Sequence, residues 1–277
     1  MMSDLSSKIQ AELNLFLESS SKNIIPSDKA LSEEQAGLKI YESAEVRVAD
    51  ANDLLFFELK KPGIIGPHYM APHEWLESAR SVICFMLYYS EDIRSSNRKD
   101  NEWPSNEWMH GRIEGHEMLM SAAAHIESFL RINGMEAISP QLDDRIGQRY
   151  HFDKQDEALP KYATRWPERH AAYIAGLGTF GLSKGLITDN GMAGRLCSVI
   201  TDAIMEPDKR PYNEIYEYCS NCGACVKRCP VGAISMESGK DHERCGAFLD
   251  VVLNKCGPPY YGCGKCQVGV PCECRIP

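Results

Sequence analysis

Long apolar segments are missing from this chain of 277 residues. No run approaches the roughly eighteen apolar residues that a membrane-spanning helix needs, and the longest, 82–89, has the length of a buried strand. The N-terminus carries Asp4 where a secretory signal has basic residues, and no apolar core follows it. We therefore expect a cytoplasmic protein without a membrane partner.

An excess of positive charge is also missing. The chain has 30 Lys and Arg residues against 39 Asp and Glu residues, which gives a formal net charge of −9 and a pI near 5.4. Such a chain does not attract a nucleic-acid backbone over its whole surface, although a local basic groove remains compatible with these numbers. The composition therefore disfavours nucleic acid as a partner.

Cysteine is nearly absent from the first 218 residues, where only Cys84 and Cys197 occur, both in apolar stretches typical of core packing. The other ten of the twelve cysteines lie between Cys219 and Cys274. Disulfides are not expected because no secretion signal is present. So dense a group in one short segment instead indicates a metal centre.

The first four of these cysteines have the spacing C-x2-C-x2-C-x3-C and are followed by Pro230. This run is typical of ferredoxins with two [4Fe–4S] clusters, in which the fourth cysteine of the run binds the other cluster. Further ligands must then follow in the chain. We assign one cluster to Cys219, Cys222, Cys225 and Cys272, and the second cluster to Cys229, Cys245, Cys263 and Cys266.

Two alternatives remain open for this segment. Zinc also binds paired C-x2-C motifs, but zinc sites rarely use a three-cysteine run with a trailing Cys-Pro. The last motif reads C-x2-C-x5-C, so Cys274 competes with Cys272 as the final ligand. Cys256 is left without a role.

Hydrophobic patterning before residue 208 indicates an α+β domain. We expect helices over 3–21 and 113–132, a helix that starts at Pro167, and strands within 37–55 and over 82–89, 135–139, 185–189 and 196–202, the last two joined by an Asn-Gly turn. The polar segment 91–104 is interpreted as a surface loop, and 141–165 shows no periodicity. The sequence EPDKRPYNE places a domain boundary that gives residues 1–208 and 209–277.

A glycine motif, Gly176-Leu-Gly-Thr-Phe-Gly181, matches the G-x-G-x-x-G pattern of dinucleotide-binding proteins. Those proteins place the motif after a strand and before a helix. Here a helical segment precedes it and a strand follows, so no helix N-terminus is expected to face a phosphate. The glycines Gly176, Gly178 and Gly181 are instead expected to let the backbone pass close to a flat cofactor or a neighbouring element.

Four stretches together carry a family resemblance: ERHAAYIAGLGTFGLSKGLIT at 168–188, R-x5-TD at 195–202, CSNCGACVKRCPVGAI at 219–234 and YGCGKCQVGVPCE at 261–273. The combination resembles epoxyqueuosine reductases and the related reductive dehalogenases. The resemblance covers the chain from about Ala79 to its C-terminus. The cluster motifs alone are shared with many ferredoxins, whereas their combination with AGLGTFG is far more specific.

The resemblance implies a nitroreductase-like cobalamin-binding core with an antiparallel or mixed sheet, followed by a ferredoxin-like double-cluster module. It implies that a low-potential donor such as ferredoxin or flavodoxin supplies electrons, and that two [4Fe–4S] clusters pass them to a corrinoid that reduces a small substrate. The alternative is an electron-transfer or corrinoid-activating partner of another protein, without a small-molecule substrate. The residues expected to face the cofactor are Arg169, His170, Gly176, Gly178, Gly181 and Arg195.

The sequence also departs from the family. Epoxyqueuosine reductases have an Asp about six residues before this Glu-Arg pair, and Tyr162 occupies that position here. Because reductive dehalogenases use a tyrosine as proton donor, we consider Tyr162 a candidate catalytic acid, with a packing tyrosine as the alternative. The C-terminal helical extension of many epoxyqueuosine reductases has no counterpart before Pro277, which together with the acidic charge puts a tRNA substrate in doubt.

Overall fold

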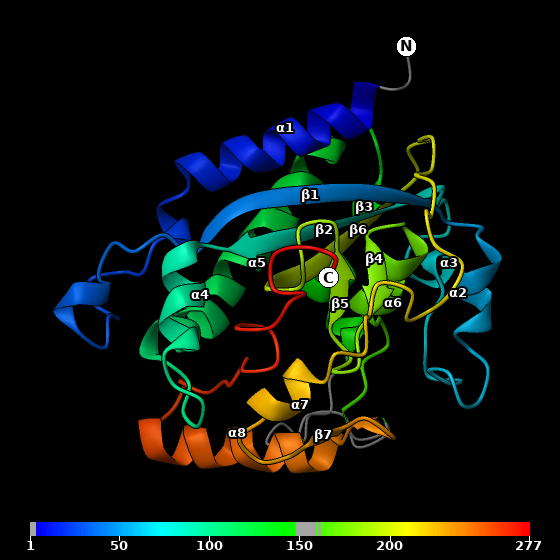
Figure 1. Cartoon of the computed structure of the whole chain (residues 1–277). Coiled ribbons are helices and arrows are strands. Elements are labelled where there is room, and N and C mark those ends of the chain that lie inside the picture. Colours follow the sequence, from blue (N-terminus) through cyan, green and yellow to red (C-terminus); the bar gives the residue numbers. More distant parts are fainter. Residues whose placement is uncertain (1–3, 148–158, 160–161) are drawn as a thin grey trace.

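A four-stranded antiparallel sheet forms the centre of the computed structural model, which describes residues 4–147, 159 and 162–277 (Figure 1). The strand order is β1 (Tyr41–Asp50), β2 (Ser81–Tyr89), β6 (Gly194–Thr201) and β3 (Ala137–Ile138). Each neighbouring pair is antiparallel, so the sheet is antiparallel rather than mixed. The fold is α+β, as expected.

Both faces of the sheet are covered by helices. Helices α1 (Asp4–Ser19) and α5 (Asn106–Ile132) share one apolar cluster with Ile83, Phe85 and Leu87 of β2. Helices α2 (Leu54–Glu58), α3 (Pro72–Trp75) and α6 (Glu168–Ile174) share a second cluster with Val82 and Cys84. Alternate residues of a strand face opposite sides, which explains why β2 is apolar along its whole length.

Cys84 and Cys197 are buried in these two clusters, one on each face of the sheet. Burial raises the pKa of both thiols well above the ordinary value. Both therefore stay neutral and pack as small apolar side chains.

The segment interpreted as a surface loop contains a helix, α4 (Glu91–Arg98). Ser90 caps its N-terminus by accepting a hydrogen bond from the Ile93 amide, and acidic residues occupy its first turn. Ile93 is its one buried apolar side chain, so the sequence has no apolar stripe that would reveal the helix. Helix α5 likewise starts earlier than expected, because Ser105 caps it.

The glycine motif has the order expected from the sequence. Helix α6 precedes it, and β4 (Gly178–Phe180) pairs with β5 (Leu186–Thr188) in a separate hairpin. Gly176 has a positive φ of 89° and lies against the backbone of Lys209. Gly178 passes so close to the Ile187 carbonyl oxygen that a Cβ atom has no space there. Strands β5 and β6 flank the Asn190-Gly191 turn but do not pair with each other.

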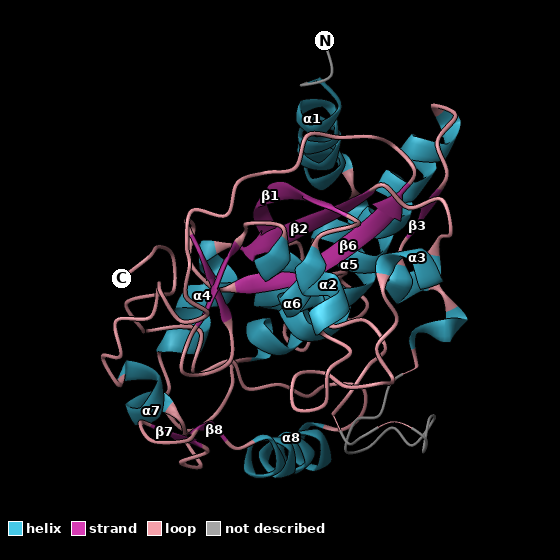
Figure 2. Ribbon diagram, turned by 90° about the vertical axis from the view of Figure 1, so that its right-hand side faces the viewer, coloured by secondary structure: helices cyan, strands magenta, loops and turns pink. Residues whose placement is uncertain are grey.

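The C-terminal part contains α7 (Ala224–Arg228), β7 (Ile234–Ser235), β8 (Gly239–Lys240) and α8 (His242–Cys256). Figures 1 and 2 show these elements as a layer apart from the sheet, with the last residues returning to the core. The division at residues 208 and 209 remains a prediction. Short 3-10 turns complete the fold at Ser21–Asn23, Glu33–Gln35, Pro140–Leu142 and Asp144–Ile146.

Part of the polar stretch 141–165 lies outside the described residues, namely 148–158, 160 and 161. Within the described part of the chain, no helix is long and apolar enough to cross a membrane.

We expect Gly178→Ala to destabilise the protein by roughly 1–3 kcal/mol, because the added Cβ meets the backbone of β5 and the hairpin has to move apart. Gly181→Ala is the matched control, since its Cβ meets the end of the Ile187 side chain at 3.1 Å, which can shift. Thermal unfolding under anaerobic conditions measures both. Equal melting temperatures for the two variants would contradict the close backbone contact.

Candidate functional site

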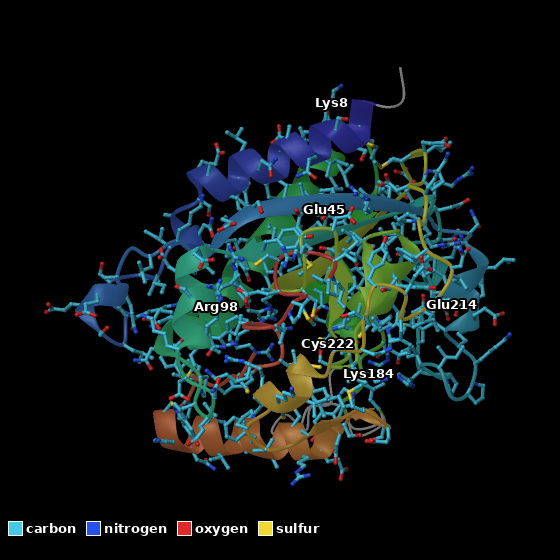
Figure 3. All side chains as sticks on the ribbon, viewed as in Figure 1. Lys8, Glu45, Arg98, Lys184, Glu214 and Cys222 are labelled. Atoms are coloured by element: carbon cyan, nitrogen blue, oxygen red, sulfur yellow. The ribbon has the colours of Figure 1, made fainter. Side chains whose placement is uncertain are left out.

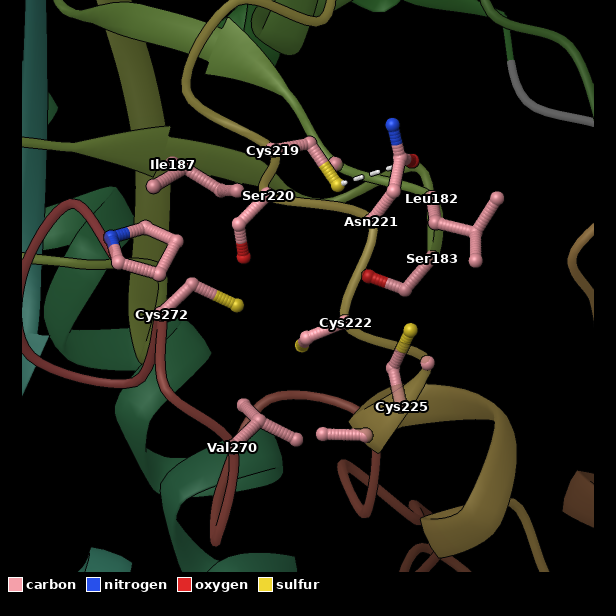
Figure 4. Close-up of a pocket in the computed structure, with 14 residues that line it drawn as sticks. Leu182, Ser183, Ile187, Cys219, Ser220, Asn221, Cys222, Cys225, Val270 and Cys272 are labelled. Atoms are coloured by element: carbon pink, nitrogen blue, oxygen red, sulfur yellow. Dashed lines mark hydrogen bonds between the residues drawn. The ribbon is translucent and has the colours of Figure 1, made fainter.

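Four thiols surround a small pocket beside the β4–β5 hairpin (Figure 4). Three come from the loop and first turn of α7, where Asn221 and Gly223 have positive φ angles of 51° and 70°. This left-handed geometry turns the backbone sharply, so that closely spaced cysteines face one space. The fourth comes from the C-terminal segment. The thiols belong to Cys219, Cys222, Cys225 and Cys272.

A second set of four thiols lines a larger cavity, and they belong to Cys229, Cys245, Cys263 and Cys266. The first follows α7, the second lies on the first turn of α8, and the others lie in the segment after α8. The Ala233 amide donates a hydrogen bond to Cys229 Sγ at 3.2 Å, a contact that tunes the potential of a bound cluster.

Mutual repulsion shows that each set is a group in space. Burial, with contributions from the nearby thiols of Cys225, Cys219 and Cys222, raises the pKa of Cys272 to about 12. Burial likewise raises the pKa of Cys263 to about 12, with contributions from Cys266, Cys245 and Cys229. As thiolates, four such groups would repel one another, and a cationic metal centre compensates that charge. Among the described residues, no three Cys, His, Asp or Glu side chains could hold a single metal ion.

Cys274 points away from both pockets. Its thiol contacts the Arg94 guanidinium of α4 and is exposed. The neighbouring Glu273 accepts hydrogen bonds from Arg98 Nη2 at 2.7 Å and from the Gly269 amide at 2.7 Å. In addition, Met192 and Ala193 donate amide hydrogen bonds to the carbonyls of Cys272 and Glu273. The C-terminal segment is thus fixed with Cys272 inside the first pocket and Cys274 outside it.

The end of α4 holds the second set of thiols against the core. The buried Lys265 ammonium donates to the Asn97 carbonyl at 2.9 Å, and the Asn97 side-chain amide donates to the Cys263 carbonyl at 2.9 Å. Arg228 of α7 donates to the same Asn97 carbonyl at 3.2 Å. Burial lowers the pKa of Lys265 to about 8. In the view of Figure 3, Cys222 lies between Arg98 of α4 and Lys184.

The larger cavity has a volume of about 1270 Å³ and lies between the sheet core and the cysteine-rich segment. Residues of α2, α5, α6, β6 and α8 line it, together with the second set of thiols. This volume exceeds the roughly 300–1,000 Å³ typical of small-molecule pockets. The thiols and the interior space therefore share one site.

Most of the site residues expected from the sequence lie at these two pockets. Tyr162, Arg169, His170 and Arg195 line the cavity, and Gly181 lines the first thiol pocket. Gly176 and Gly178 are not among the lining residues of either pocket, and their close neighbours are backbone atoms of Lys209 and Ile187. These two glycines serve the packing of neighbouring elements.

Tyr162 has a φ of 65°, which is rare for a residue with a side chain. Its ring lies 6.1 Å from the His242 ring, centroid to centroid, and its hydroxyl packs close to Gly246 of α8. Tyr162 thus lies where helix α8 lines the cavity.

Glu168 is a cavity residue that the sequence did not single out. Its Oε1 atom is buried without a hydrogen-bond partner, while Oε2 accepts a hydrogen bond from Ser198 Oγ at 2.8 Å. Ser198 Oγ in turn accepts one from Trp166 Nε1 at 2.8 Å. Burial raises the pKa of Glu168 to about 7, so this carboxyl can hold or release a proton near neutral pH. The one feature of the sequence that could have indicated its role is its place in the Glu168-Arg169 pair at the start of the 168–188 stretch.

Two histidines also present buried atoms to the cavity without a hydrogen-bond partner in the described structure, Nε2 of His68 and Nδ1 of His170. Burial, together with the charge of Arg169, lowers the pKa of His170 to about 4, so the ring is neutral at pH 7. Unsatisfied buried polar atoms around one space are expected where a ligand supplies the missing hydrogen bonds.

Cys272→Ser is expected to lose iron from the first pocket, because a hydroxyl replaces one of the four thiolates. Cys274→Ser is the matched control two residues away and should keep the wild-type iron and sulfide content, since Cys274 contacts Arg94 instead. Iron and sulfide analysis after anaerobic reconstitution measures both. The reverse result would show that Cys274 is the ligand.

Glu168 should make stability depend on pH. Its folded-state pKa of about 7 exceeds the ordinary 4.5, so the folded protein binds more protons than the unfolded chain between these pH values. Stability conferred by the protonated carboxyl is present below about pH 4.5 and is lost as pH rises through 7, by roughly 3 kcal/mol in total.

Glu168→Gln abolishes this titration, so its stability relative to wild type should increase from pH 5 to pH 8. Anaerobic thermal unfolding across that range measures the difference, with the exposed variant Glu237→Gln as control, because Glu237 lines neither pocket. Parallel pH curves for wild type and Glu168→Gln would contradict the raised pKa.

Comparisons with known proteins agree with the cysteine geometry. Residues 212–235 match the 4Fe-4S binding domain family. This match confirms the prediction of iron–sulfur binding for the first cysteine run.

An epoxyqueuosine reductase of Francisella cf. novicida (strain Fx1) is 31% identical over 225 residues, which cover 74% of this chain and 56% of that protein. The chain thus spans about half the length of this curated relative. The expected resemblance to epoxyqueuosine reductases is confirmed.

Solved structures show the same fold at lower identity. An epoxyqueuosine reductase with an epoxyqueuosine-modified tRNA stem loop superimposes with a TM-score of 0.52, at 18% identity over 97% of this chain and 66% of that chain. A catabolic reductive dehalogenase in complex with 3-bromo-4-hydroxybenzoic acid gives 0.50, at 16% identity over 98% of this chain and 36% of that chain. The first of these proteins is bound to a tRNA stem loop, so this fold occurs in a nucleic-acid-binding protein, although the composition of the present chain disfavours nucleic acid. The chain is therefore a homologue of the epoxyqueuosine reductases with a 4Fe–4S binding domain, and it shares its fold with them and with reductive dehalogenases.

Proposed function

We propose that this protein is an iron–sulfur reductase that receives electrons from a low-potential donor such as ferredoxin or flavodoxin and reduces a substrate in the large cavity. In this proposal the two sets of thiols hold two [4Fe–4S] clusters, which carry one electron at a time. The observation that carries the proposal is that the second set of thiols lines the same cavity as Glu168, Tyr162 and His170. Electrons and protons can therefore reach one enclosed space.

The cavity residues fit a corrinoid. The volume of about 1270 Å³ suits a macrocycle, and the unpartnered atoms of His68, His170 and Glu168 suit the polar amide groups around its edge. A bound corrinoid would supply a strongly reducing metal centre, and the surrounding protein would bind and orient it. We also propose that the core that binds the corrinoid has a nitroreductase-like fold.

Protons must accompany the electrons, and two residues of the cavity can provide them. Glu168 has a pKa of about 7, so it is partly protonated at neutral pH and recovers its proton readily. Tyr162 occupies the position of the family acid but packs against α8. We therefore propose Glu168 as a proton source beside Tyr162.

The large cavity beside the second set of thiols supports a reductase with its own substrate over an electron carrier that serves another protein, because a carrier needs no space for a small molecule. Two substrate classes follow from the structural neighbours, a small halogenated phenol and an epoxide-bearing tRNA nucleoside. Both classes are candidates for this cavity, and turnover assays with each distinguish them.

Anaerobic reconstitution with iron, sulfide and hydroxocobalamin tests the proposal. We expect about one corrinoid per chain to remain after gel filtration, with a visible spectrum that changes on reduction by a low-potential dye. If the protein holds its clusters but binds no corrinoid, the result would contradict the reductase proposal and favour an electron carrier.

The loaded protein is then supplied with 3-bromo-4-hydroxybenzoate and, separately, with an epoxyqueuosine-modified tRNA stem loop. We expect Glu168→Gln to slow turnover of whichever substrate reacts by roughly 10²-fold or more, while its iron content and corrinoid uptake stay unchanged. Tyr162→Phe is compared under the same conditions. Full activity of both variants would exclude these residues as proton donors.

A further inference from the structure

Two arginines and a histidine lie together on one wall of the large cavity. Arg112 and His116 are four residues apart on α5 and therefore project from the same face of the helix, and Arg195 lies on the neighbouring strand β6. Arg195 Nη1 donates to the Arg112 carbonyl at 3.3 Å, and Arg195 Nη2 lies 3.3 Å from His116 Nδ1. Arg112 Nη2 donates to the Tyr261 hydroxyl at 2.8 Å.

No carboxylate compensates these two guanidinium charges in the part of the chain that the structure describes. Three carboxylates line the cavity, and each has another partner. Glu58 pairs with Lys61, Glu117 pairs with Lys29 at 3.0 Å, and Glu168 binds Ser198.

The interior charge of Arg195 is therefore unusual. Burial opposes its positive charge, but the neighbouring hydroxyls of Tyr89, Tyr41 and Tyr261 favour it, so the pKa of Arg195 is raised overall without a carboxylate among the groups that raise it. A charge kept in an interior without a counter-ion is costly, so a position of this kind is expected to receive an anion.

His116 adds a further donor to this wall. Burial, together with the charges of Arg195 and Arg112, lowers its pKa to about 4, so the ring is neutral at pH 7. Because a guanidinium only donates, Nδ1 accepts from Arg195, and the ring hydrogen lies on Nε2. This wall of the cavity thus offers two charged guanidinium groups and one neutral imidazole N–H as hydrogen-bond donors.

We propose that Arg112, Arg195 and His116 form a subsite for a phosphate group inside the cavity. Guanidinium forks match the spacing of phosphate oxygens, and two of them balance the charge of a phosphate of about −1 to −2. This subsite deepens the proposed function, since it lies in the same cavity. The phosphate belongs either to the substrate or to the nucleotide tail of a corrinoid.

Inorganic phosphate is the first probe, added to cluster-loaded, corrinoid-free protein at constant ionic strength. We expect saturable binding by calorimetry in the wild type, and at least a tenfold weaker affinity in Arg195→Gln and Arg112→Gln. Arg195→Lys keeps the charge and should recover part of the affinity. Arg131→Gln removes a charge from the same helix outside the cavity, where Arg131 pairs with Glu127, and should bind phosphate as the wild type does.

Iron content and circular dichroism identify variants that fail to fold. If Arg195→Gln fails to fold, the phosphate affinity of Arg195→Lys tests the subsite instead. Absence of saturable phosphate binding in the wild type, or equal binding in wild type and Arg195→Gln, overturns the subsite. This titration needs no corrinoid, so it stands even where the reductase proposal fails.

Cobalamin and cobinamide identify the source of the phosphate, because cobinamide lacks the nucleotide tail and its phosphodiester. For a cofactor phosphate, we expect Arg195→Gln to weaken cobalamin binding but not cobinamide binding, and cobalamin to displace inorganic phosphate. For a substrate phosphate, cobalamin-loaded protein still binds inorganic phosphate, and Arg195→Gln leaves the affinity for both corrinoids unchanged. Either pattern supports the subsite, and weakened binding of both corrinoids without any effect on phosphate overturns it.

Discussion

Each four-iron cluster needs four thiolates around it, and the first cysteine run can supply only three to one cluster. The chain therefore has to return with a fourth thiol. In this structure the return is fixed by backbone hydrogen bonds from Met192 and Ala193 and by the Glu273–Arg98 ion pair. Helix α4 is thus more than a surface element, because it anchors the segment that completes the first thiol group.

The same return encloses the cavity. Hydrogen bonds hold the cysteine-rich segment against the end of α4 and involve Lys265, Asn97 and Arg228. The space between this segment and the sheet core is the large cavity. Cys225 of the first group and Cys266 of the second are near enough to influence each other electrostatically. In the proposed function, this proximity gives electrons a short path from a cluster in the first group to one in the second, which faces the cavity.

Features set by local spacing could be predicted from the sequence, and features set by tertiary contacts could not. The cysteine grouping follows from a short motif, and the continuous apolar run 82–89 predicted strand β2. Helix α4 was not predicted from the sequence, because a capping serine and polar residues define it and it has no apolar stripe. Arg195 was expected at the cofactor. Glu168, Arg112 and His116 were not predicted there from the sequence, because burial and missing counter-charges arise only when distant segments pack together.

The most direct measurement of the central claim is the electron paramagnetic resonance spectrum of the fully reduced protein. Two neighbouring clusters should give about two spins per chain and a spectrum broadened and split by their magnetic interaction. A single unsplit cluster signal, or no iron–sulfur signal at all, would contradict two adjacent thiol groups that each hold a cluster.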